Sequence, residues 1–270
     1  MVGDVAVAGR VVTGSAPVWD ITSGTLLWVE IGGEAVHRFD PATGRDEPLG
    51  LPQPVAAAHP RRRGGLVLTL RDGVALVDSD GARRWLVYWA REGVAGIAST
   101  VDRAGRLWVT TGGDGALLRV EPDGAVALVL QGVDLAGVAF APDAATMYLA
   151  DPAAEHIAAA DFAPDTGELG PRRPLYPVPG GPTALCVDAQ GWLWVAPRGH
   201  NAVLRYRADG QLDREFALGA AHPTGCAFGG IQLTDLFVTA APPPCSAEHA
   251  GPLLIFPDAG EGLPSPVFAG

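Results

Sequence analysis

The stretch VDRAGRLWV, residues 101–109, joins the end of an apolar strand to a polar turn and then to a second strand that begins Leu-Trp-Val. Triplets of the same character recur along the chain at intervals of about 40 residues. A chain with such a period is built from copies of one unit, so the fold follows from what a single unit forms. The six triplets are Leu27–Val29, Leu66–Leu68, Leu107–Val109, Met147–Leu149, Leu193–Val195 and Leu236–Val238.

Each unit predicts four short strands. An apolar strand and a turn such as VDAQG (Val187–Gly191) precede the triplet, and an alternating strand such as LLRVEPDG (Leu117–Gly124) follows it. A fourth strand, for example AVALVL (Ala125–Leu130), completes the unit. Four short strands in about 40–45 residues are typical of a propeller blade. We therefore predict an all-β, six-bladed β-propeller with four antiparallel strands per blade and no substantial helix, as one domain over residues 1–270.

The ring must close, because an open propeller leaves two sheet edges without partners. We expect the N-terminal strand near Val5–Val12 to pair with a last strand near Val267–Phe268. One repeat position is aromatic in most units, and we expect these side chains to pack between neighbouring sheets rather than to bind a ligand. They are Trp28, Trp108, Tyr148, Trp194 and Phe237.

Composition excludes several classes of function. The formal net charge is −11, and an acidic surface repels phosphate backbones, so we expect no nucleic-acid partner. No apolar run reaches the ~18 residues of a membrane-spanning helix, and the N-terminus lacks the features of a signal peptide. We therefore predict a cytoplasmic protein with no membrane partner. The chain contains no lysine, which excludes Schiff-base chemistry. Three cysteines without metal-site spacing (Cys186, Cys226 and Cys245) fit reduced thiols.

Several segments carry a family resemblance. SAPVWD (Ser15–Asp20), LLWVEIGGEAVHRFDPATG (Leu26–Gly44), GVAFAPDAATMYLAD (Gly137–Asp151), LCVDAQGWLWVA (Leu185–Ala196) and HPTGCAFGG (His222–Gly230) resemble the senescence-marker-protein/gluconolactonase/regucalcin family, in that family's order. The resemblance implies a six-bladed propeller. It also implies a calcium- or zinc-dependent lactonase or esterase with its metal at the mouth of the central channel.

The positions that resemblance assigns to the metal carry other residues here. The family's metal-binding glutamate falls on Ser15, its metal-binding asparagine on Ala136, and the aspartate that also serves as catalytic base on Thr183. The family's Asn-Asp pair, whose asparagine helps to hold the substrate, falls on Ile97 and Ala98. The chain thus resembles a divergent member that lacks the metal ligands, and we expect neither a metal nor another cofactor.

The repeat leads to the same ring of positions. Counting four residues back from the end of each innermost strand gives six equivalent residues, which we expect at the channel mouth. None is charged, whereas a hard divalent cation needs carboxylate or carbonyl oxygens. The ring predicts a site for a less polar substrate than a sugar lactone. The six residues are Ser15, Pro54, Ile97, Ala136, Thr183 and Thr224.

Candidate catalytic residues lie on loops of the same predicted face. PRGHN carries Arg198, His200 and Asn201; His200 is a candidate acid or base near neutral pH, and Arg198 a candidate partner for an anionic or carbonyl oxygen. Asn201 is a candidate substrate-binding residue. His222 lies two residues before Thr224 and is the second candidate histidine.

Two carboxylates follow triplet strands, namely Glu30 and Asp151. Near an apolar channel each would have a raised pKa and could act as an acid or base. For every one of these residues the alternative is a solvated loop or turn residue.

Three functions are compatible with the sequence. The first is a metal-independent enzyme, a cyclase, isomerase or hydrolase, that acts on a small and largely apolar molecule in the channel. The second is a non-catalytic protein that binds such a molecule. The third is a lactonase or esterase with a relocated metal held by Glu30, Asp134 or Asp151. The substrate and the oligomeric state are not determined by the sequence.

Overall fold

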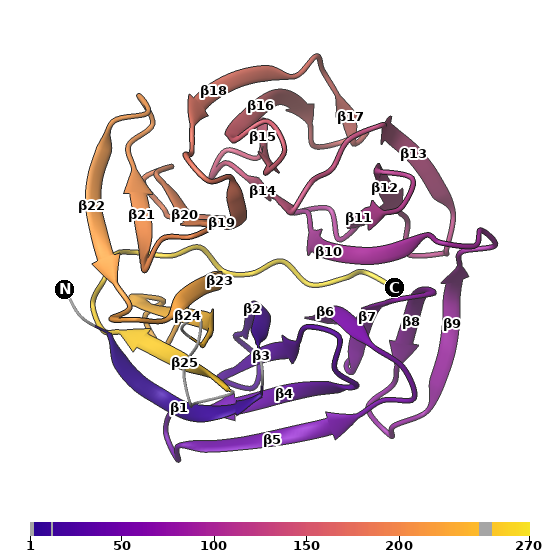
Figure 1. The fold of residues 1–270 in the computed structure, drawn as a ribbon. Helices are drawn as coiled ribbons and strands as arrows, with labels where there is room; N and C mark the ends of the chain where they lie inside the picture. The colour runs from indigo at the N-terminus through magenta and orange to yellow at the C-terminus, as the bar shows by residue number, and fades with distance from the viewer. Residues whose placement is uncertain (1–2, 12, 243–249) are drawn as a thin grey trace.

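The structure, a computed structural model, describes residues 3–11, 13–242 and 250–270. It confirms the six-bladed β-propeller: six antiparallel sheets surround one axis, and each sheet is a blade (Figure 1). The described residues contain no α-helix. Accordingly, no helix among them could span a membrane. Cys245, one of the three cysteines, falls outside the described residues.

The strands occupy four positions in each blade, from the axis outward. The innermost strands are β2 (Gly14–Asp20), β6 (Val55–Pro60), β10 (Ala95–Val101), β14 (Gly137–Phe140), β19 (Pro182–Val187) and β23 (His222–Gly229). The second strands are β3 (Thr25–Glu30), β7 (Leu66–Leu70), β11 (Leu107–Gly112), β15 (Thr146–Asp151), β20 (Leu193–Pro197) and β24 (Asp235–Ala241). They contain all six apolar triplets.

The third and fourth positions complete the blades. The third strands are β4 (Ala35–Asp40), β8 (Gly73–Val77), β12 (Ala116–Val120), β16 (His156–Ala163), β21 (Ala202–Tyr206) and β25 (Gly251–Phe256). The outermost strands are β5 (Arg45–Gly50), β9 (Arg83–Tyr88), β13 (Val126–Gln131), β18 (Arg173–Pro177), β22 (Leu212–Ala217) and β1 (Asp4–Val11). A short extra strand, β17 (Glu168–Leu169), pairs with the end of β16.

The aromatic repeat position packs between sheets, as predicted. Trp108 and Trp194 are fully buried. Their indole N–H groups donate to buried aspartates one turn earlier, Asp102 at 2.9 Å and Asp188 at 3.0 Å. Each pair satisfies a polar group that burial would otherwise leave without a partner. The Val-Asp turns of the repeat therefore have a structural role.

The N-terminal strand does close the ring, but its predicted partner was wrong. β1 pairs with β25, with Val5 opposite Leu254 and Val7 opposite Leu253. β25 also pairs with β24, which makes it the third strand of blade six. Residues near Phe268 have another role, because Phe268 forms a bridge with Arg61 of blade two instead.

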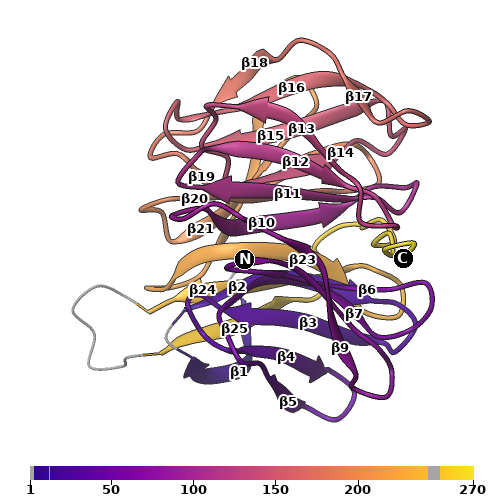
Figure 2. The same cartoon turned by 90° about the vertical axis from the view of Figure 1, so that its right-hand side faces the viewer.

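The segment after β25 crosses one end of the channel (Figure 1), and the side view places it at one end of the propeller axis (Figure 2). It begins against blades five and six, where Gly262 donates to the Leu233 carbonyl at 2.7 Å. It ends against blade two, where Phe268 donates to the Pro60 carbonyl at 2.9 Å. The Phe268 side chain is fully buried with residues of blades two and three. We call residues 257–270 the tail.

Most innermost strands contain a β-bulge near the channel mouth. In β10, β19 and β23 the register shifts skip one residue each, namely Ile97, Thr183 and Thr224. A bulged residue has no ladder partner, and the strand bends there. In β2 two residues are skipped, and one of them, Ala16, has φ 47°. The bulges therefore explain why these positions turn toward the axis.

Candidate functional site

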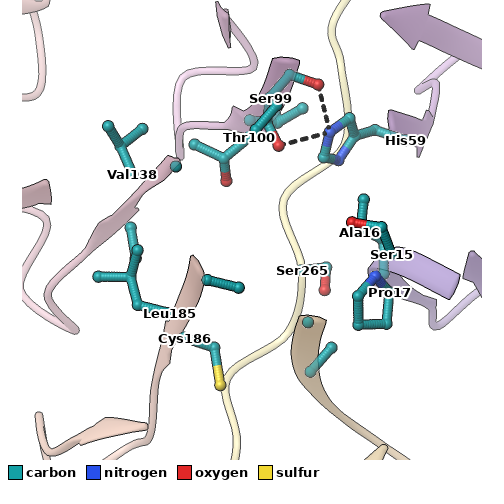
Figure 3. Close-up of a pocket in the computed structure, with 18 of the residues that line it drawn as sticks. Ser15, Ala16, Pro17, His59, Ser99, Thr100, Val138, Leu185, Cys186 and Ser265 are labelled. Atoms are coloured by element: carbon teal, nitrogen blue, oxygen red, sulfur yellow. Dashed lines mark hydrogen bonds between the residues drawn. The ribbon is translucent and has the colours of Figure 1, made fainter. Parts of the chain in front are cut away.

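A cavity of about 1030 Å³ occupies the centre of the propeller. All six innermost strands line it, and residues Leu263–Val267 of the tail line it at one end. In the close-up, the tail crosses the channel in projection, with Leu185 on one side of it and Ser15 on the other (Figure 3). Among the described residues no segment crosses the opposite mouth in the same way. The channel is therefore a pocket with a floor rather than a tunnel.

The predicted ring is found at this cavity, with one change of register. All six ring residues line the cavity. In blade two, however, the residue skipped by the bulge is Ala56, and Pro54 precedes β6. Ala56 lines the cavity too, so the apolar character of the ring is unchanged.

Two of the ring hydroxyls are already engaged with the backbone. Thr183 Oγ1 donates to the Ala196 carbonyl at 2.8 Å, and Thr224 Oγ1 donates to the Gly14 carbonyl at 2.5 Å. A hydroxyl that donates to the backbone keeps its oxygen as an acceptor only. The ring thus offers a ligand two threonine oxygens that can only accept hydrogen bonds, the hydroxyl of Ser15, and otherwise apolar surface.

The predicted polar residues are divided between the cavity and the rim. Arg198 lines the cavity, whereas His200, His222 and Asn201 are not among its described lining residues. His222 Nδ1 lies 3.3 Å from the backbone carbonyl of His200, so the two histidines meet through the backbone rather than ring to ring. Asn201 donates to the Gly219 carbonyl at 3.2 Å.

The two predicted carboxylates lie in turns outside the lining. Asp151 accepts the backbone N–H of Ala154 at 3.0 Å. The Glu30 side chain lies against Gly33 in the turn that follows β3. Neither is among the described lining residues, and exposed Asp134 is not among them either. The catalytic roles suggested for these residues stay predictions.

Sequence reasoning missed a contact between His59 and Ser99. His59 lies on β6 and Ser99 on β10, and both line the cavity. His59 Nε2 lies 3.0 Å from Ser99 Oγ (Figure 3). Burial lowers the pKa of His59 from 6.5 to about 4, although a hydrogen bond to the Ser99 carbonyl opposes the change. The imidazole is therefore neutral at neutral pH.

Two thiols form a second contact that was missed. Cys186 of β19 and Cys226 of β23 both line the cavity, with their sulfur atoms 3.6 Å apart. The hydrogen bond between the thiols, followed by burial, raises the pKa of Cys186. Both missed pairs are separated by 40 residues. That separation equals one repeat. A search of the sequence for residues one repeat apart on consecutive innermost strands would therefore have indicated both contacts.

The charged lining is entirely basic. The described lining residues include four arginines and no carboxylate, in a chain whose net charge is −11. Arg71 follows β7 of blade two and Arg198 follows β20 of blade five, which places them on opposite blades at the mouth away from the tail, and neither has an ion-pair partner among the described residues. Arg62 and Arg103 lie near the tail. Such a lining attracts anionic groups and repels cations.

A family model described as the SMP-30/gluconolactonase/LRE-like region matches residues 13–242. The chain belongs to this family. It is 31% identical over 255 residues to 6-deoxy-6-sulfogluconolactonase of Pseudomonas putida, covering 88% of this chain and 86% of that protein. It is 30% identical over 253 residues to regucalcin of Danio rerio, covering 84% and 82%. The resemblance inferred from the sequence is thereby confirmed.

Solved structures in this family share the whole fold. A calcium-binding regucalcin of Agrobacterium tumefaciens superimposes with a TM-score of 0.88 at 23% identity, covering 97% of each chain. A luciferin-regenerating enzyme superimposes with a TM-score of 0.89 at 21% identity, covering 99% of this chain and 100% of the other. At this identity the likeness concerns the fold alone.

A calcium-binding relative raises the question whether this chain could hold a divalent cation in the same channel. Calcium takes six to eight oxygen ligands, normally with carboxylates among them. The described residues of the cavity provide no carboxylate, and four arginines oppose a cation. Elsewhere in the described part of the chain, no three His, Cys, Asp or Glu side chains are grouped as metal ligands. The donor set present does not fit such an ion.

Proposed function

We propose that this chain is an enzyme that hydrolyses a small, largely apolar ester or lactone in its channel without a divalent metal ion. The observation that carries the proposal is the cavity lining: apolar walls, a few hydroxyls, one neutral histidine and arginines, with no carboxylate among the described lining residues. Hydrolysis is favoured over cyclisation or isomerisation because relatives are named as lactonases.

The arginines support the binding half of this proposal. Arg71 and Arg198 at the mouth can donate hydrogen bonds to the carbonyl oxygen of an approaching substrate or to the carboxylate of its product. The side chains of Ile97, Val138 and Leu185 offer apolar contact within the cavity. The partner we propose is therefore a small molecule with an apolar body and a polar carbonyl end.

A non-catalytic binder would use the same lining and is the alternative. A lactonase with a relocated metal has less support, since Glu30, Asp134 and Asp151 lie outside the lining. His200 and His222 keep their proposed role as acids or bases at the rim. Residues that line the cavity are the stronger candidates for catalysis, because a bound substrate contacts them directly. A cytoplasmic location and the lack of a nucleic-acid partner stay predictions from the sequence.

The test is hydrolysis of a panel of lactones, with aliphatic side chains or with sugar hydroxyls, in the presence of a chelator. We expect turnover of aliphatic lactones that the chelator does not reduce. Activity that disappears with chelator and returns with calcium would refute the proposal, as would stoichiometric calcium or zinc in the purified protein. Saturable binding without turnover of any substrate would favour the binder.

A further inference from the structure

Ser99 and His59 face each other across the gap between blades two and three (Figure 3). His59 Nε2 lies 3.0 Å from the Ser99 hydroxyl oxygen and 3.1 Å from the Ser99 carbonyl oxygen. A nucleophile and its base need a contact of about 2.6–3.2 Å. Ser99 is only partly buried and lines the cavity, so a ligand in the channel can reach its hydroxyl.

Thr69 occupies one lone pair of the Ser99 hydroxyl oxygen and leaves the Ser99 proton free for another partner. Thr69 is fully buried on β7, and its hydroxyl donates to Ser99 Oγ at 2.7 Å. Because Ser99 Oγ already accepts this bond, its own proton is available to Nε2 of His59. The tautomer that accepts it has its proton on Nδ1. The three side chains then form a chain of hydrogen bonds, in which Thr69 donates to Ser99 and Ser99 donates to His59.

The surroundings of His59 suit the transfer of that proton. Burial keeps the imidazole neutral, because its pKa is lowered to about 4, and no charged side chain is among the causes. Once Nε2 carries the proton, the Ser99 carbonyl at 3.1 Å accepts it as a hydrogen bond. That bond stabilises the imidazolium, which is why it opposes the lowering of the pKa.

The space in front of Ser99 suits an apolar acyl group. Val138 lies on the neighbouring blade four, and Leu185 lies on blade five, across the channel from His59 (Figure 3). β10 is the innermost strand of its sheet, so one edge of its backbone has no strand partner. Backbone N–H groups on such an edge point into the channel and can stabilise a developing oxyanion.

We infer that Ser99 is the nucleophile of an acyl transfer, that His59 is its base, and that Thr69 is a positioning residue. The inference rests on the proposed function and names its chemistry. Ser99 Oγ forms a bond to the carbonyl carbon of the ester or lactone while its proton moves to His59 Nε2. The bond between that carbon and the alkoxy oxygen breaks, and the leaving oxygen takes the proton from His59.

Water completes the cycle. It attacks the carbonyl carbon of the Ser99 ester and gives one proton to His59 Nε2. The bond to Ser99 Oγ breaks, the carboxylic acid leaves, and Ser99 Oγ recovers its proton from His59. From a lactone, the product is a hydroxy acid, whose carboxylate meets the arginines of the lining.

The first experiment is covalent labelling of the whole chain with an alkyl fluorophosphonate. Serine attacks phosphorus, and fluoride leaves with the proton. Peptide mass spectrometry is expected to find one label, on Ser99, and none in Ser99→Ala. Labelling of His59→Gln should be at least about 100-fold slower, the usual contribution of a general base. Ser79→Ala, which removes an exposed serine outside the cavity lining, is the control and should label as the wild type does.

The second experiment measures hydrolysis of a p-nitrophenyl alkanoate. Ser99→Ala is expected to lose at least about 100-fold in kcat. Thr69→Val should lower kcat with little change in KM, and Thr69→Ser, which keeps the hydroxyl, should restore it. A merely structural role for Thr69 predicts no such split. Thermal unfolding of each variant shows whether it is folded.

The outcomes separate the inference from the proposed function. A label on another residue or no label on folded wild type overturns the inference, and so does chelator-resistant turnover by Ser99→Ala within twofold of wild type. In that last case the proposed function stands. Loss of wild-type turnover in chelator refutes the proposed function, whereas specific labelling of Ser99 that requires His59 still supports the nucleophile.

Discussion

Replacing His59 with glutamine should remove much of the pH dependence of stability between pH 5 and 7. His59 has a pKa of about 4 in the folded protein and an ordinary value of 6.5. Between these values the unfolded chain binds a proton that the folded chain does not. The free energy of unfolding therefore rises with pH in this window and falls as the solution is acidified.

The structure sets the size of the effect. At about 1.4 kcal/mol per pH unit, the full window from pH 6.5 down to about 4 corresponds to about 3 kcal/mol. Between pH 7 and pH 5 the expected loss is about 2 kcal/mol. The side chain is nearly fully buried, so solvent screening reduces this figure little.

Urea denaturation followed by tryptophan fluorescence, at half-unit steps from pH 5 to 7.5, measures the effect. Carboxylates also titrate near the acid end of this pH range. The quantity of interest is therefore the difference in free energy of unfolding between wild type and His59→Gln. That difference should shrink by about 2 kcal/mol as the pH falls from 7 to 5. His200→Gln, which removes an exposed imidazole, is the control and should keep the wild-type slope. Parallel curves for wild type and His59→Gln would refute the assigned burial of a neutral histidine.

Three further predictions concern the tail, the thiols and the ring. Phe268→Ala should lower the free energy of unfolding by about 3–5 kcal/mol in urea denaturation, because it empties a fully buried site. In the folded protein Cys186 should react with iodoacetamide at pH 8 at least about 10-fold more slowly than in urea, because its thiol pKa is raised. The triple variant Ser15→Glu, Ala136→Asn and Thr183→Asp should gain calcium binding measurable by calorimetry, because it adds oxygen ligands at the channel mouth.

Each of these has an outcome that contradicts it. For Phe268→Ala, the control is Ile231→Ala, which truncates a fully exposed side chain. A loss in free energy of unfolding no greater than that of the control would mean that the tail contributes little to stability. Equal rates for Cys186 in folded and unfolded protein would contradict its burial beside Cys226. Calcium binding by the wild type equal to that of the triple variant would show that the native donor set already suffices.

The sequence predicted the blades well because each blade carries its own signal. The Leu-Trp-Val triplets and the Val-Asp turns are local, and both recur in the structure as second strands and as Trp–Asp hydrogen bonds. The partner of β1 was wrong because two apolar segments near the C-terminus, Leu253–Phe256 and Val267–Phe268, have similar composition. Only the first continues the meander from β24.

The site was predicted less well because its contacts join different blades. The ring positions were found, since they follow from register within one unit, but β6 continues to Pro60, so four residues back from its end is Ala56 rather than Pro54. The contact between His59 and Ser99 depends on how two sheets twist past each other, which no local pattern encodes. A search for polar residues one repeat apart would have suggested this pair.

The bulges also bear on how such a protein acquires new substrates. Ile97, Thr183 and Thr224 have no partner in the strand ladders, yet each lines the cavity. Replacing Ile97 alters the chemistry that a ligand meets while the pairing of the blades stays as it is, whereas replacing Thr183 or Thr224 also removes a hydrogen bond to a backbone carbonyl. Evolution can therefore change selectivity at Ile97 at small cost to folding, and a protein engineer can use the same freedom by randomising this position first.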